Sequence, residues 1–101
     1  MLRHIVMWKV KEEALGKTKL ELCAEICRLL QTLPPHITEI KQLSVAINHP
    51  LCPADNYDVV LDTVFNSVED LQTYQVHPKH VEVASFIKQV VFQRACIDVE
   101  C

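Results

Sequence analysis

Glycine, aromatic residues and blocks of like charge are all scarce in this 101-residue chain. It has one glycine, and aromatic residues make up 6% of it, whereas 50% of its residues are hydrophobic. No glycine-rich phosphate loop, P-loop or serine nucleophile elbow is present, so nucleotide chemistry and serine hydrolysis are not indicated. The apolar content excludes a disordered chain. The sequence predicts one compact domain over residues 1–101, rich in helices and strands.

Charge and hydropathy limit the kinds of binding partner that the sequence suggests. The formal net charge of −3 argues against nucleic acid or an anionic membrane. No apolar stretch approaches the length of a membrane span. The first ten residues include His4, Trp8 and Lys9 and lack a small-residue cleavage site, so they do not read as a signal peptide. We therefore expect a cytoplasmic protein with neither nucleic acid nor membrane as partner.

Five cysteines are present, but no CxxC motif. Cys23 and Cys27 have ordinary helical spacing, and without a secretory signal we expect free thiols. His77 and His80 have HxxH spacing, but a capping His77 would point away from His80. Since a tight metal site needs three or four converging ligands, we expect no metal site and no cofactor.

Hydrophobic periodicity divides the chain into two similar halves. Residues 2–10 alternate as a strand, with His4 on the same face as Val6 and Trp8. A helical stripe follows and ends at Pro34-Pro35; it consists of Leu20, Cys23, Ile26, Cys27, Leu30 and Leu33. The remaining expected elements are strands 37–47, 57–65 and 92–99 and helices 68–75 and 78–90, with helix 17–33 in the first half.

This order predicts a ferredoxin-like, split βαβ fold of the α+β class. One four-stranded antiparallel sheet carries its helices on a single face. The other face would be too apolar for water, because it carries Ile5, Met7, Ile40, Ala46, Val60 and Val64. We therefore expect a homodimer in which two sheets pack face to face about a two-fold axis, forming a dimeric α/β barrel.

The segment Tyr74-Gln75-Val76-His77-Pro78-Lys79-His80 is the most informative motif. Pro78 fits the first turn of a helix and leaves His77 as the capping residue. Tyr74 then closes one helix, and His80 lies in the first turn of the next, on the stripe of Val83, Ala84 and Ile87. Since His80 and His4 both face inward, the two histidines and Tyr74 form a candidate acid–base set.

These features resemble the stress-responsive α/β-barrel (Dabb) family over essentially the whole chain. The residues that carry the resemblance are His4-Ile5-Val6-Met7-Trp8-Lys9-Val10, Val64-Phe65-Asn66-Ser67, Leu71, Tyr74 and His77-Pro78-Lys79-His80. The resemblance implies a ferredoxin-like fold and dimerisation through the sheets. The family includes stress-induced members, members without known chemistry and a plant polyketide cyclase.

By resemblance to the cyclase, His80 is the general base on an activated methylene, Tyr74 hydrogen-bonds within the site, and His4 binds or polarises the substrate carbonyl. The cyclase has a further active-site Tyr where this chain has Ile26. Some family structures hold a cation at the end of the first helix, here residues 30–36.

Two functions remain open. One is a cofactor-free enzyme, a cyclase or isomerase-type lyase, that transfers a proton next to the carbonyl of a small hydrophobic ligand. The other is a non-catalytic dimeric protein with a stress-related or ligand-binding role. A cavity that reaches both His4 and His80 would favour the enzyme.

Overall fold

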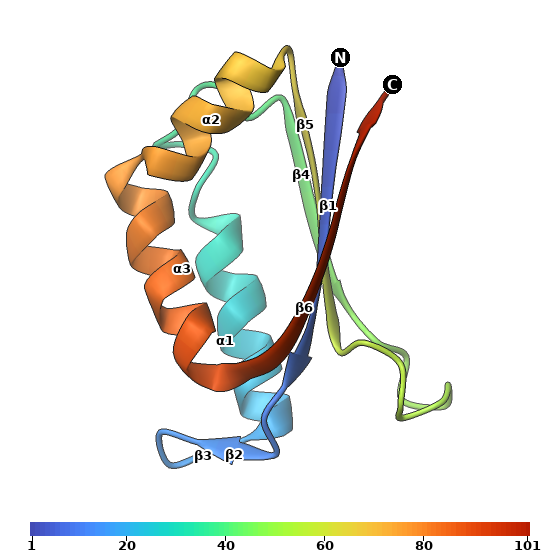
Figure 1. Ribbon diagram of the computed structural model, residues 1–101. Helices are drawn as coiled ribbons and strands as arrows, with labels where there is room; N and C mark the ends of the chain where they lie inside the picture. Colours follow the sequence, from blue (N-terminus) through green and yellow to red (C-terminus); the bar gives the residue numbers. More distant parts are fainter.

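The computed structural model describes residues 1–101, and its main elements follow the expected order. Four long strands form one sheet, and the helices lie on one side of it (Figure 1). The elements are β1 (Leu2–Val10), β2 (Glu13–Ala14), β3 (Lys17–Thr18), α1 (Lys19–Gln31), β4 (Gln42–Ile47), β5 (Val59–Phe65), α2 (Val68–Val76), α3 (Pro78–Val90) and β6 (Val91–Glu100). The predicted ferredoxin-like α+β fold is confirmed.

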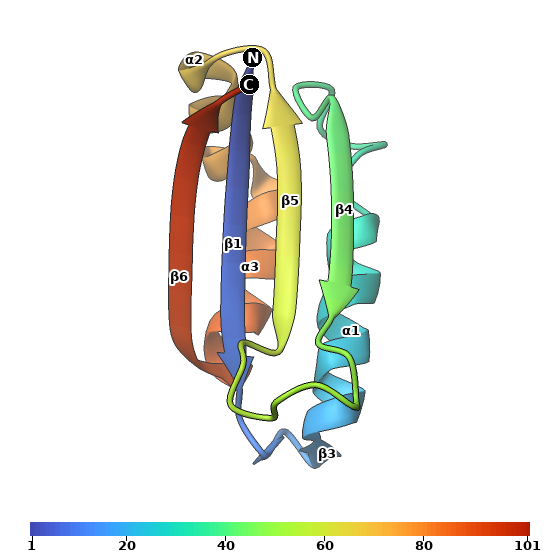
Figure 2. The same cartoon turned by 90° about the vertical axis from the view of Figure 1, so that its right-hand side faces the viewer.

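The sheet has the strand order β4-β5-β1-β6, and every pairing is antiparallel (Figure 2). Strand β1 lies between β5 and β6, with His4 opposite Thr63 on one side and Asp98 on the other. Its alternate residues are buried, beginning with Leu2 and His4. His4 therefore lies on the face that the helices cover, as its position in the alternation predicts.

The helix boundaries follow from capping residues. Thr18 and Glu21 form a capping box at the start of α1, and the Ser67 hydroxyl accepts a hydrogen bond from the backbone N–H of Asp70 at the start of α2. His77 ends α2 and caps α3, where its Nδ1 accepts a hydrogen bond from the backbone N–H of Lys79 at 3.1 Å. Pro78 occupies the first turn of α3. The helix–helix junction expected from the motif is present.

The first helix starts later than expected. Lys17 and Thr18 pair with Glu13 and Ala14 in a hairpin, and the loop residues Leu15 and Gly16 have φ values of 53° and 74°. Two positive φ angles in a two-residue loop are typical of a type I′ turn. The helix therefore begins at Lys19 and ends at Gln31, and Leu20, assigned to the buried stripe, is 71% exposed.

The prediction of a strand over 37–47 was wrong for its first half. The Leu33 carbonyl accepts hydrogen bonds from the N–H groups of His36 and Ile37, and the Ile37 carbonyl accepts one from Ile40. These turn bonds leave β4 to begin at Gln42. Ile37 is fully buried and Ile40 packs against the core. The prediction that Ile40 lies on the bare sheet face was therefore wrong.

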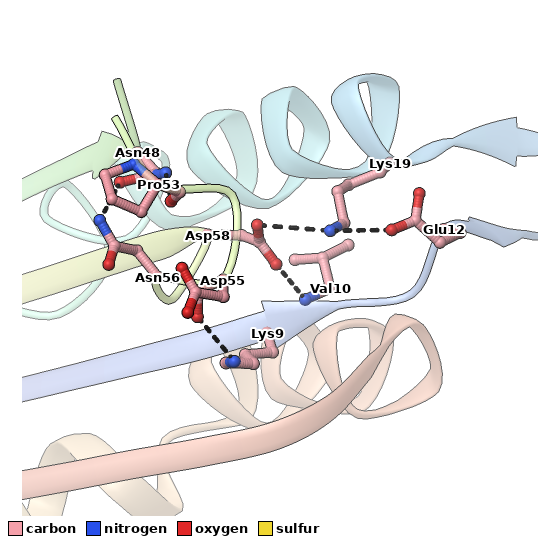
Figure 3. A network of polar contacts seen from close by, with 9 residues as sticks. All are labelled: Lys9, Val10, Glu12, Lys19, Asn48, Pro53, Asp55, Asn56 and Asp58. Carbon is pink, nitrogen blue, oxygen red and sulfur yellow. Dashed lines mark hydrogen bonds and ion pairs between the residues drawn. The ribbon is translucent and has the colours of Figure 1, made fainter. Parts of the chain in front are cut away.

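The third long strand begins at Val59, two residues after its predicted start. Asp58 precedes it and is largely buried: its carboxylate accepts a hydrogen bond from the backbone N–H of Val10 at 2.8 Å and lies 3.5 Å from Lys19 Nζ (Figure 3). This network fastens the start of β5 to the end of β1 and to α1. Asp58 therefore pairs within its own chain.

The second face of the sheet carries no helix (Figure 2). The strand register places Ile5, Met7, Ala46, Val60 and Val64 on it, as predicted. Ile97 on β6 joins them and is 58% exposed. The loop between β4 and β5 bends away from the helices, toward the side of this bare face (Figure 1). None of the helices combines the length and apolar character that crossing a bilayer requires.

Candidate functional site

A cavity of about 130 Å³ lies between the sheet and the helices. Eight of its 12 lining residues are hydrophobic, Val6 and Trp8 of β1 and Ile87 of α3 among them. The four polar lining residues are His4, Gln75, His80 and Arg94. The cavity therefore reaches both histidines that the sequence singled out, and Tyr74 also forms part of its wall.

His80 and Tyr74 meet because the helix changes direction at His77-Pro78. Their ring centroids are 4.3 Å apart, and the planes are inclined by 51°. His80 Nδ1 lies 3.0 Å from the carbonyl oxygen of Gln75 at the end of α2. A carbonyl can only accept, so Nδ1 carries the proton and Nε2 of the neutral ring holds the lone pair. The backbone thus fixes His80 in the tautomer of a base.

His4 is held by the last strand. Its Nδ1 lies 2.5 Å from a carboxylate oxygen of Asp98, its neighbour across β1 and β6. Since the carboxylate only accepts, Nδ1 donates this bond and Nε2 is the ring nitrogen left for a ligand. The His4 ring is 6.4 Å from that of Tyr74 and 6.5 Å from that of Phe65. Both the orientation and the charge environment of His4 are therefore set by Asp98.

Burial shapes the acid–base properties of the other two groups. Removal from water lowers the pKa of His80. Electrostatic repulsion by His4, Arg94 and His77 lowers it further, although the hydrogen bond to the Gln75 carbonyl raises it. Burial raises the pKa of Tyr74 to about 12, although the positive charge of Arg94 opposes this rise. At neutral pH His80 is consequently an uncharged base, and Tyr74 is a hydroxyl donor.

The Tyr74 hydroxyl has no hydrogen-bond partner in the protein, although the residue is only 1% exposed. A buried hydroxyl without a partner is costly, and native proteins satisfy most such groups. The ring packs against Phe65 at 5.0 Å and against His80, so its position is fixed. A ligand that enters the cavity could accept the missing hydrogen bond.

Three residues that sequence reasoning missed, Arg94, Cys96 and Asp98, come from β6. They alternate along this strand on the helix-covered face, opposite Trp8, Val6 and His4. The available signal was their period of two in the last strand, read together with the pairing to β1. The site is therefore built from β1, β6 and the α2–α3 junction.

Several positions bear on metal binding. His77 Nδ1 accepts from the backbone N–H of Lys79 and His80 Nδ1 bonds the Gln75 carbonyl, so neither Nδ1 of the HxxH pair is free for a metal. His4, Cys96 and Asp98 do converge, with candidate ligand atoms within 4.8 Å of one another. A metal there would have to displace the His4–Asp98 hydrogen bond. At the end of α1, the Leu29, Leu30 and Leu33 carbonyls already accept backbone N–H groups.

The remaining sequence features lie away from the cavity. Ile26, where the resemblance to the cyclase implies a further tyrosine, is fully buried in the core and does not line the cavity. All five cysteines are free. Burial raises the pKa of the Cys23 thiol to about 11, which makes it a poor nucleophile at neutral pH.

The sheet is ferredoxin-like, one of its faces is bare and apolar, and a histidine-lined cavity lies under its helices. These features define a small α+β domain with a pocket between its layers. The chain belongs to the stress responsive A/B barrel domain (Dabb) family, whose model matches residues 2–101.

Comparisons with individual proteins also find this domain family and this fold. A stress-response A/B barrel domain-containing protein of Arabidopsis thaliana is 30% identical over 83 residues, which are 82% of this chain. The match spans only 30% of the length of that plant protein. A dimeric ferredoxin-like protein of unknown function from Bacteroides fragilis has a TM-score of 0.87 and 26% identity, covering 99% of this chain and 95% of that one. Hydroxynitrile lyase from Passiflora edulis has a TM-score of 0.79 and 19% identity, covering 97% and 90%.

Proposed function

We propose that this protein is an enzyme that transfers a proton at the carbon next to a carbonyl group, with His80 as the base. The observation that carries the proposal is one cavity that joins His80, whose Nδ1 is bonded to the Gln75 carbonyl, a His4–Asp98 pair and a Tyr74 hydroxyl without a partner. Perturbed titratable groups that converge in a pocket are typical of active sites.

The proposed step moves one proton and one electron pair. Nε2 of His80 takes a proton from the carbon beside the carbonyl, and the C–H electron pair forms a carbon–carbon double bond. The carbonyl π electrons move onto oxygen, giving an enolate. Tyr74 donates a hydrogen bond to this oxygen. His4, as an imidazolium whose Nδ1–H is bonded to Asp98, donates its Nε2–H to the same oxygen, since charge that develops on oxygen is stabilised by fixed donors. The enolate then attacks a second carbonyl or is protonated elsewhere, as in a cyclase or an isomerase.

The surroundings of each group suit its role. The lowered pKa of His80 keeps it unprotonated at neutral pH, at the cost of some basicity. The raised pKa of Tyr74 keeps its proton in place for donation. Asp98 holds the His4 ring in one orientation and would balance the charge of an imidazolium, as carboxylates do beside catalytic histidines.

We further propose that the protein is a homodimer joined through the bare sheet face. The apolar face of Ile5, Met7, Val60 and Ile97 supports this arrangement, and the Bacteroides fragilis relative is described as dimeric. The cavity lies on the opposite side of the sheet, so the dimer would support the site without closing it.

The test is exchange of ketone α-hydrogens for deuterium in heavy water, followed by proton NMR over a panel of small ketones. We expect wild-type protein to accelerate exchange for at least one ketone, and His80→Ala to lose about 10²- to 10⁴-fold of that rate while remaining dimeric. His36→Ala, at an exposed histidine, is the control and should keep the full rate. An unchanged rate in His80→Ala dismisses His80 as the base.

The second candidate is a non-catalytic ligand-binding dimer. Ile26 favours it, because this fully buried side chain offers no hydrogen bond where the cyclase has a tyrosine. In that case the Tyr74 hydroxyl would bind a carbonyl ligand without turnover. Binding of a ketone that never exchanges its α-hydrogens would support this candidate over the enzyme.

A further inference from the structure

Arg94 is the cation of the site, and it lies where the cavity meets a wider groove. The groove, of about 460 Å³, runs outward between α3 and β6. The cavity and the groove share four wall residues: Trp8, Ala84, Ile87 and Arg94. The inner cavity holds only a small group, so a larger molecule would have to extend past Arg94 into the groove.

The guanidinium of Arg94 has no partner in the chain. The ion pairs of the protein involve Arg3, Arg28, Lys19 and His4. Asp98, the nearer of the two acids on the same face of β6, is already bonded to His4, and Glu100 lies two residues further along the strand. No aspartate or glutamate lines the cavity or the groove, whereas Lys88 of α3 lines the groove with Arg94. Arg94 and Lys88 are both solvent-exposed, and neither forms an ion pair within the chain.

Arginine binds carboxylates and phosphates through paired, charge-assisted hydrogen bonds, and apolar walls strengthen such bonds. Trp8, Ile87 and Phe92 supply apolar walls around this stretch of the groove. An anionic group at Arg94 would leave the neighbouring part of the same molecule inside the inner cavity, beside His80 and Tyr74. The positive charge would also favour an enolate over its neutral parent.

We propose that the substrate is an anionic carbonyl compound, whose carboxylate or phosphate group binds Arg94 at the junction of cavity and groove. The proposal rests on the proposed function for the carbonyl at His80, and it adds the charge of the substrate and the residue that selects it. Lys88 adds a second positive charge for an anion that reaches further along the groove.

The experiment measures binding of matched probes by NMR titration. Levulinate carries a ketone and a carboxylate, its methyl ester is the neutral counterpart, and dihydroxyacetone phosphate carries a ketone and a phosphate. We expect levulinate to bind wild-type protein more tightly than its ester. Arg94→Ala should weaken levulinate binding by roughly 10- to 100-fold, leave ester binding unchanged, and Arg94→Lys should recover part of the loss.

Two controls separate a specific site from general electrostatics. Arg3→Ala removes a cation that pairs with Asp62 on the bare sheet face, so it should leave levulinate binding unchanged. If the site is built for a phosphate, Lys88→Ala should weaken binding of dihydroxyacetone phosphate more than binding of levulinate. If the site is built for a carboxylate, Lys88→Ala should affect binding of the two probes equally. The proposal is overturned if no anion binds more tightly than the ester, or if Arg94→Ala and Arg3→Ala have equal effects.

The same samples distinguish this proposal from the proposed function. Binding that depends on Arg94, without deuterium exchange in levulinate or in any ketone of the panel, would leave the anion site standing and remove proton transfer. Exchange that persists in Arg94→Ala for both levulinate and its ester would keep His80 as a base and remove the anion site.

Discussion

Replacing Tyr74 by phenylalanine should stabilise the protein while impairing the site. The hydroxyl is buried without a protein partner, and the ring makes the packing contacts with Phe65 and His80. Phenylalanine keeps those ring contacts and removes the unsatisfied group. Such a gain in stability with a loss of function is expected where a side chain is kept for activity.

The magnitude follows from the cost of burying a hydroxyl. Mutational data place it at about 1–3 kcal/mol when no hydrogen bond compensates. Water inside the cavity would supply a partner and lower the cost, so we expect the free energy of unfolding to rise by about 1 kcal/mol. For a domain of this size, that corresponds to an increase in Tm of roughly 4–8 °C.

Chemical denaturation followed by circular dichroism measures the change at a fixed protomer concentration, since the proposed dimerisation would make apparent stability depend on concentration. Tyr57→Phe is the matched control. The Tyr57 hydroxyl accepts a hydrogen bond from Gln93 at 2.9 Å on the surface, so its loss should change stability by about 0.5 kcal/mol or less. If Tyr74→Phe instead destabilises the protein by about 1 kcal/mol or more, the hydroxyl has a structural partner and our account of the cavity is wrong.

Three further outcomes test the site and the assembly. The exchange rate should rise with pH through a midpoint below 6.5, because burial lowers the pKa of His80. The free energy of unfolding should fall as the pH drops below 6.5, since the unfolded chain then binds the proton more readily than the folded chain does. A midpoint above 6.5 would contradict both expectations. Asp98→Asn should lower the exchange rate by roughly 10- to 100-fold by weakening the charge-assisted bond to His4, and an unaltered rate would remove His4 from the mechanism. Ile97→Asp should give a monomer in light scattering, because an unpaired buried charge costs about 3–5 kcal/mol; Leu20→Asp, at an exposed position of α1, should stay dimeric, and a dimeric Ile97→Asp would move the interface elsewhere.

The parts of the fold that local rules determine were predictable from sequence. Alternation in residues 2–10 placed His4 on the buried face, and Pro78 with a capping His77 placed His80 at the start of a helix. Both inferences depend on residues close together in the chain. Local rules alone therefore identify His4, Tyr74 and His80 as the three candidate side chains.

The other half of the site depends on long-range pairing. The last strand has apolar residues at both parities, so its sequence does not tell which residues face the helices. Only the register with β1 places Arg94 and Asp98 beside the cavity. The prediction of a strand over 37–41 was wrong for a related reason. A buried Ile37 has the same apolar pattern in a turn as in a strand. The turn hydrogen bonds form only once Leu33 is fixed at the end of α1.

This protein departs from good packing at its cavity, and such departures favour a function there. Two buried side-chain atoms have no hydrogen-bond partner, Arg3 Nε and Tyr74 Oη, and Arg3 Nε still lies 3.3 Å from the Asp62 carboxylate. Tyr74 therefore has the buried polar atom without any compensation. It lines the same cavity as a histidine with a depressed pKa and an arginine without an acid. An apolar residue at position 74 or 80 would make a more stable domain, so these two departures around one cavity indicate a place kept for a ligand.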